Sequence, residues 1–169
     1  MKKLVIQLFV GMFLLCCGFQ AIAQTSSFDI LTLSEKLDNA PQTERERFIT
    51  LKIETAKRAY VESDFTFSSL SSEEGPVEVI EFEGNSALKV NLNENITEIL
   101  SLVEMIILNV ESDENFDELH AIVRKSPLVR YIVIRSYNAF TKEGVSSLFE
   151  DLSPDFKNEV IIEILPEPK

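Results

Sequence analysis

Cysteine is almost absent from this chain, whose only two copies are Cys16 and Cys17. Residues 24–169 therefore contain no thiol, which excludes a disulfide, a cysteine nucleophile and a cysteine-ligated zinc site from that part of the chain. A domain without cross-links has to be held together by its apolar core.

Histidine and glycine are also scarce. His120 is the only histidine, so a zinc motif that needs two histidines is excluded, and no serine–histidine–aspartate set can be assembled around it. Beyond residue 23 the only glycines are Gly75, Gly84 and Gly144, which leaves no phosphate-binding loop and no dinucleotide fingerprint. We therefore expect no cofactor and no metal site, and the sequence favours a protein without enzymatic activity.

Basic residues are outnumbered, with 16 lysines and arginines against 28 aspartates and glutamates and a net charge of −12. Such a chain repels nucleic acid, so we expect no nucleic-acid partner. A cationic ligand, divalent cations or solubility alone would each account for the acidity. A protein partner, including a second copy in a homodimer, is a further alternative.

The first 23 residues have the pattern of a bacterial signal peptide. Lys2 and Lys3 precede an apolar stretch, residues 4–19, and Ala21 and Ala23 are small residues placed as signal peptidase requires. Cleavage after Ala23 leaves 146 residues with a net charge of −14, a length that suits one domain. The sequence thus predicts an exported protein of the periplasm or the cell surface.

Two other interpretations of this segment stay open. As a membrane anchor it is just long enough to span a bilayer, although Gln7, Gln20 and the small exit residues favour removal. As a lipoprotein signal it would be acylated at Cys16 or Cys17, which would anchor the protein stably. That processing prefers a small residue directly before the cysteine, and neither cysteine has one. No later segment is apolar enough for a transmembrane helix.

The rest of the chain divides into an N-terminal helical segment, a loop and an α/β region, which span residues 24–67, 68–76 and 77–169. In the helical segment, apolar residues recur at helical spacing from Ile30 to Leu37. A second helix is predicted over 43–62, where Thr43 and Glu46 match a capping box. The helical segment and the α/β region are expected to form one compact domain.

The α/β region opens with residues 77–82 and 87–92, which alternate like the two strands of a hairpin. Beyond them strands alternate with amphipathic helices, and the strands are predicted at 104–110, 130–136 and 159–164. The connections are long enough for right-handed crossovers between parallel strands.

Three stretches of this region fit the phrase L-x-x-L-x-L, and their first residues, Val77, Leu102 and Leu128, are 25 and 26 positions apart. In this respect residues 77–164 resemble leucine-rich repeats of the ribonuclease-inhibitor type. The resemblance implies repeated βα units in an open solenoid, whose alternate strand positions line a solvated concave face. Val110 and Ser136 stand where that family has a buried asparagine.

The alternate strand positions are large and apolar here, namely Ile106, Leu108, Ile132, Ile134, Val160 and Ile162. Leaving each of these side chains in water would cost about 1.5–3 kcal/mol, and strands that are apolar on both faces belong in a sheet that is covered on both faces. The sequence therefore predicts a compact α/β fold with a parallel βαβαβ C-terminal half. We expect the N-terminal helices to cover the face with these residues, and an open solenoid is the alternative.

Polar residues follow two of the predicted strands, 104–110 and 130–136. Because ligands of open parallel sheets bind at the carboxyl ends of the strands, we predict a small-ligand site built from Glu111, Asp113, Arg135, Tyr137 and Asn138. Solvated loops that cap helices account for the same residues. No catalytic residue is assigned.

The absence of a nucleophile set, a metal cage and a nucleotide loop favours an exported protein that binds or scaffolds without catalysis. One alternative is a small hydrolase that uses paired carboxylates, which needs a cleft and raised pKa values. Another is a self-associating envelope protein or lipoprotein, in which a second copy buries the apolar face of the sheet.

Overall fold

A seven-stranded sheet forms the centre of the protein, with the strand order β1-β7-β6-β5-β4-β2-β3. The computed structural model describes residues 29–53, 56–62, 67–69, 75–83, 94–110, 117–149 and 158–166. The strands are β1 (Asp29–Thr32), β2 (Arg58–Val61), β3 (Phe67–Ser69), β4 (Val79–Phe82), β5 (Met105–Asn109), β6 (Tyr131–Ser136) and β7 (Glu159–Ile164). All are parallel except β3, which is antiparallel to β2 at one edge. The predicted α/β class is confirmed.

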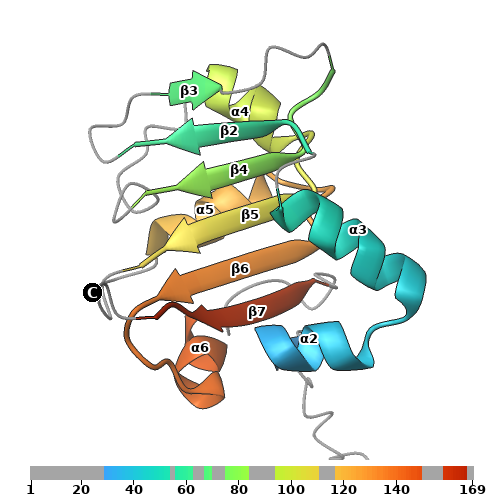
Figure 1. Cartoon of the computed structure of the whole chain (residues 1–169). Helices are drawn as coiled ribbons and strands as arrows, with labels where there is room; N and C mark the ends of the chain where they lie inside the picture. The colour runs from blue at the N-terminus through green and yellow to red at the C-terminus, as the bar shows by residue number, and fades with distance from the viewer. Residues whose placement is uncertain are drawn as a thin grey trace, which may run out of the picture.

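Helices cover both faces of this sheet (Figure 1). They are α2 (Leu33–Asn39), α3 (Gln42–Lys52), α4 (Glu94–Leu100), α5 (Asp117–Arg124) and α6 (Lys142–Leu148). The first two lie on one face, which we call the front face, and the other three lie on the back face. Among the described residues no helix is long and apolar enough to cross a bilayer.

The strands of the α/β region repeat in register. Val79 of β4 pairs with Met105 of β5, and Met105 pairs with Tyr131 of β6, so that 26 positions separate each partner from the next. Each of these strands is followed by a connection that returns to the start of the next strand, so the chain repeats a βα unit. The resemblance to leucine-rich repeats stays a prediction.

The two faces of the sheet carry separate apolar cores. On the back face Ile106, Ile132 and Val160 are fully buried with residues of α4, α5 and α6. On the front face, Phe48 and Leu51 of α3 pack with the alternate residues of the same strands: Val79, Met105, Ile107, Tyr131, Val133 and Ile161. The strands are buried on both sides, as the sequence predicts.

The N-terminal helices cover one face of the sheet, as predicted, but it is not the face that carries Ile106 and Ile132. The N-terminal helices lie on the front face, whereas α4, α5 and α6 cover the side chains of Ile106, Leu108, Ile132, Ile134, Val160 and Ile162. The reason is the handedness of parallel connections. The order β4-β5-β6-β7 advances in one direction across the sheet, so right-handed crossovers place every intervening helix on the same face. Only the opposite face remains for α2 and α3.

Three local predictions also need correction. The segment from Ile30 begins as β1, and its helix starts only at Leu33, where Thr32 is the N-cap. The helix predicted over 43–62 ends at Lys52, and its last part is β2. The predicted hairpin does not form, because the two neighbours of β4 in the sheet are β2 and β5, and both are parallel to it. Residues 87–92, the second strand of that prediction, lie outside the described residues.

The capping box of α2 makes a testable contribution to stability. Thr32 Oγ1 accepts a hydrogen bond from the Glu35 amide, and the Glu35 carboxylate accepts one from the Thr32 amide at 2.7 Å. We expect Thr32→Ala to lower the free energy of unfolding by about 1 kcal/mol, as measured by urea denaturation. The control is Thr50→Ala in the last turn of α3, where the Thr50 hydroxyl donates back to the Glu46 carbonyl. This change is expected to be neutral or slightly stabilising, because alanine is the better helix former.

The pKa of Glu35 lies far below its usual range, at about 2, because Lys142 donates to its carboxylate and, within the capping box, so do the amide and the hydroxyl of Thr32. The stabilisation from Glu35 is therefore present above its unfolded pKa and is lost as the pH falls toward 2. NMR titration of Glu35 should show this low pKa in the parent protein and a higher one in Thr32→Ala. Equal pKa values in the two proteins would contradict the capping geometry.

Candidate functional site

Polar residues replace the apolar ones at the carboxyl ends of the strands on the front face. Glu83 follows β4, Asn109 ends β5 and Arg135 lies near the end of β6, and 26 positions separate each from the next. In the ladder Asn109 pairs with Arg135, and Arg135 pairs with Glu163 of β7. The helices α2 and α3 cross the opposite half of this face, over the starts of the strands (Figure 1). The sheet therefore presents a row of polar side chains beyond its apolar front core.

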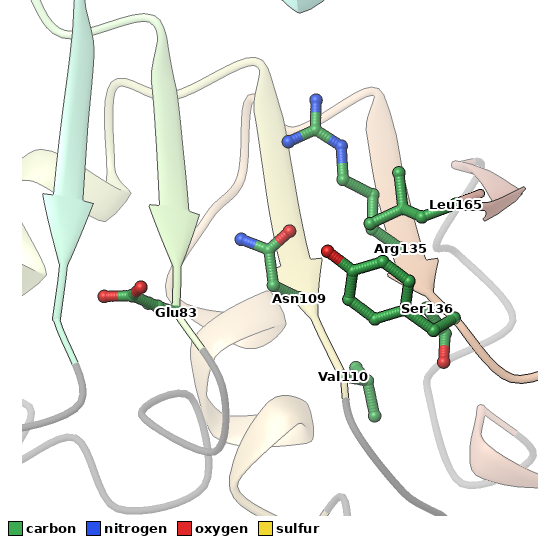
Figure 2. Close-up of a pocket in the computed structure, with 7 residues that line it drawn as sticks. Glu83, Asn109, Val110, Arg135, Ser136 and Leu165 are labelled. Carbon is green, nitrogen blue, oxygen red and sulfur yellow. The ribbon is translucent and has the colours of Figure 1, made fainter. Parts of the chain in front are cut away.

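A pocket of about 250 Å³ lies at this edge (Figure 2). It is formed where β4, β5, β6 and β7 end, and its lining residues are Glu83, Asn109, Val110, Arg135, Ser136, Tyr137 and Leu165. The ladder continues to its rim, since the Leu165 amide donates to the Ser136 carbonyl at 2.7 Å and the Val110 amide donates to the Arg135 carbonyl at 2.8 Å. The backbone around the pocket is thus held by sheet hydrogen bonds.

The structure brings together two of the five residues predicted for a site. Arg135 and Tyr137 both line the pocket. Asn138 is exposed beside it, and its amide donates to the Ser136 hydroxyl oxygen at 3.0 Å. Glu111 and Asp113 lie outside the described residues, so their assignment stays a prediction.

Behind the pocket, five charged side chains alternate in sign across the front face, and we call them the charged chain. Lys52 Nζ lies 2.7 Å from Glu163, and Glu163 in turn lies 2.9 Å from Arg135 Nε. Arg135 Nη1 and Arg58 Nη1 each lie 2.8 Å from Glu81, one at each carboxylate oxygen. The side chains are only 10–16% exposed. At that burial, pairing is what makes the charges tolerable.

The charged chain is anchored to the end of α3. Arg58 Nη2 donates to the carbonyls of Leu51 and Lys52 at 3.0 and 2.9 Å. These are among the last carbonyls of the helix, where the helix dipole favours a cation. A continuous path of hydrogen bonds therefore runs from the C-terminus of α3 to Arg135 at the pocket.

The charged chain also fixes Asn109 in one orientation. Its amide nitrogen donates to Glu81 Oε1 at 3.0 Å and to the Phe82 carbonyl at 3.1 Å. Both of these partners only accept, so the nitrogen must face them and the oxygen must face the other way. Figure 2 shows the Asn109 oxygen on the side of Arg135. Asn109 thus offers the pocket an acceptor.

Hydrogen bonds keep the Glu163 carboxylate of the charged chain ionised. Burial alone would raise the pKa of Glu163, but the hydrogen bonds from Lys52 and Arg135 outweigh it and lower that pKa. Glu81 accepts from Arg58, Arg135 and Asn109. A general acid needs a raised pKa, so Glu163 suits positioning rather than proton transfer, and Glu81 is occupied by its three donors. Within the described part of the chain, no three acidic or histidine side chains group as they would around a metal ion.

Sequence reasoning missed several residues of this region, although two signals pointed to them. Counting 26 positions back from Arg135 gives Asn109, and a further 26 gives Glu83. Glu81 and Glu163 are charged residues inside apolar strands, where a carboxylate needs a cationic partner from another element. The repeat spacing and the misplaced charges together would have located the site.

Comparison with known proteins adds no candidate function. No family model matches the chain, and neither a curated protein nor a solved structure matches it. The geometry of the pocket and of the charged chain is therefore the basis for assigning a function.

Proposed function

We propose that this chain is an exported binding protein without catalytic activity, and that it takes a small ligand at the carboxyl edge of its sheet. The observation that carries the proposal is the pocket formed by Asn109, Arg135, Tyr137 and their neighbours at the ends of parallel strands. That is the position at which open parallel sheets bind ligands.

The second support is the rigidity of the polar groups. The charged chain holds Arg135 through two carboxylates, and it fixes the orientation of Asn109 before any ligand arrives. A preorganised site loses little conformational entropy on binding. Because Glu81 and Glu163 are committed to this task, the hydrolase alternative gains no support from them.

The fold does not support the self-association alternative. That alternative requires an apolar face of the sheet that only a second copy could cover. In the described residues, helices already bury both faces, with Ile106 and Ile107 each fully buried on opposite sides.

Export rests on the sequence pattern of residues 1–23, which lie outside the described residues. Intact-mass analysis of the protein from its native cell envelope tests it. The expected mass is that of residues 24–169. A mass that includes an acylated Cys16 or Cys17 would instead establish a lipid anchor.

A direct test of binding compares Tyr137→Ala with Leu128→Ala. The two side chains are similarly exposed, at 52% and 54%, but only Tyr137 lines the pocket. NMR of the labelled protein with a panel of small metabolites should show shifts in the amides of Asn109, Ser136 and Leu165. We expect Tyr137→Ala to weaken that binding about tenfold, the loss of one good contact of about 1.4 kcal/mol, and Leu128→Ala to leave it unchanged.

If no compound moves the pocket amides, or if the shifts gather elsewhere on the molecule, the pocket is not the binding site. Equal losses in both variants would indicate a general effect on the fold.

A further inference from the structure

We infer that the ligand of this pocket is a neutral polyhydroxylated molecule, a saccharide of about one ring. This inference rests on the proposed binding function and adds the chemical class of the ligand. It follows from the groups that the pocket leaves free.

Among the described residues that line the pocket, Arg135 is the cation, and its charge is already paired. Arg135 uses Nε for Glu163 and Nη1 for Glu81. Figure 2 shows its guanidinium turned back along the strands, away from Val110 and Ser136. A carboxylate or phosphate ligand would have to compete with two carboxylates and would also meet the net charge of −12. An anion is therefore disfavoured.

A cationic ligand gains no attraction from the pocket either. Among the described residues, Asn109 Oδ1 is an acceptor on the pocket side and calls for a ligand that donates, whereas Figure 2 shows the Glu83 carboxylate turned away from Asn109. An ammonium group would donate, but in the described part of the chain it would find no unpaired carboxylate beside Asn109, because Glu81 and Glu163 are already paired with arginine and lysine side chains. With Arg135 paired and Glu83 turned aside, the described wall presents no free charge of either sign. Neither sign of ligand gains a net attraction, which leaves an uncharged donor, the hydroxyl group.

Hydroxyl groups of a ligand match the polar groups that remain in the pocket. The buried Ser136 hydroxyl already accepts from the Asn138 amide. The exposed Tyr137 hydroxyl can donate to a ligand oxygen, while Asn109 accepts from a ligand hydroxyl. A molecule with neighbouring hydroxyls satisfies donors and acceptors together, since each hydroxyl does both.

Part of the pocket wall is apolar, and the pocket is small. Tyr137 presents a half-exposed ring, and Val110 and Leu165 add aliphatic surface. These suit the C–H face of a sugar ring. A volume of about 250 Å³ is below the range of about 300–1,000 Å³ that holds drug-sized ligands. It accommodates one ring, or the end unit of a longer chain.

The experiment measures binding of three probe sets to the purified mature protein by NMR of the pocket amides. One set is neutral monosaccharides and their short oligosaccharides, the second is acetate and inorganic phosphate, and the third is ethanolamine and short diamines. We expect shifts at Asn109, Ser136 and Leu165 with a saccharide. We also expect a dissociation constant that changes less than twofold between 20 mM and 500 mM NaCl, because salt screens only charged ligands.

Two variants sharpen this test. Tyr137→Phe keeps the ring and should retain affinity within about threefold, whereas Tyr137→Ala should lose at least tenfold. If an amine or an anion binds the pocket with marked salt dependence and saccharides do not, the ligand class is overturned while the binding function stands. If no set moves the pocket amides, both the class and the proposed function fall. Tighter binding of an oligosaccharide than of its monosaccharide would identify a chain end as the ligand.

Discussion

Replacing Lys36 with methionine is expected to lower the free energy of unfolding by about 2–4 kcal/mol at neutral pH. Lys36 is 1% exposed, and its ammonium group binds Glu44 and lies 2.5 Å from Glu159. It also lies over the Tyr131 ring, 4.8 Å from the ring centre. Without the lysine, two carboxylates face each other. Because each is 25–30% exposed, solvent limits the cost to below that of a fully buried pair.

The pH dependence gives this prediction a second readout. Burial opposes the charge of Lys36, but the hydrogen bonds with Glu159 and Glu44 prevail and raise its pKa above 10.5. The contribution of Lys36 is therefore complete below its unfolded pKa and is lost as the pH rises through the folded value. Urea denaturation at pH 7 and above pH 11 should show the difference between the parent and Lys36→Met shrinking at the higher pH.

The matched control is Lys125→Met, at an exposed position at the end of α5. It removes the same charge and adds the same side chain, so a change within about 0.5 kcal/mol is expected. Similar losses in the two variants would show that Lys36 acts through net charge rather than through its buried contacts.

Replacing Glu81 with glutamine is the second large effect. Glu81 is 9% exposed and lies between Arg58 and Arg135. An amide keeps the shape but leaves two buried guanidinium groups without their shared anion, so we expect a loss of about 3–4 kcal/mol in the free energy of unfolding. The pocket amides of Asn109 and Ser136 should also shift in NMR spectra, because Asn109 and Arg135 lose their common partner.

Glu83→Gln is the control for this change, since Glu83 is exposed two residues later on the same side of the sheet. It should alter stability by no more than about 0.5 kcal/mol. A stable Glu81→Gln variant with unchanged pocket amides would mean that the charged chain does not organise the site.

The sequence predicts the second half of this fold much better than the first. The strand at 159–164 has the predicted bounds, and β5 and β6 begin one residue after their predicted starts. Their apolar runs are bounded by polar loops and repeat at 26 positions, so each unit supports the others. By contrast, β1 and β2 are four residues long. Their pairing with β7 and β4 is what makes them strands, and no local pattern shows it.

The site was predictable in its location but not in its members. The rule that ligands gather at the carboxyl ends of strands leads to Arg135 and Tyr137. It does not reach Asn109, because the predicted strand there extended to Val110 and hid a polar residue among apolar ones. Lys52 and Arg58 come from the segment that was predicted as one helix, and only the break after Lys52 lets both approach the sheet.

The pairing of β1 with β7 has a consequence for how the chain matures. Asp29 and Glu159 are partners across the sheet although 130 positions separate them in the chain. Of the described strands β1 is synthesised first and its partner β7 last. Neither this pairing nor the contact of Lys36 with Glu159 can form until β7 has been made. Synthesis must be nearly complete before this border of the sheet can close.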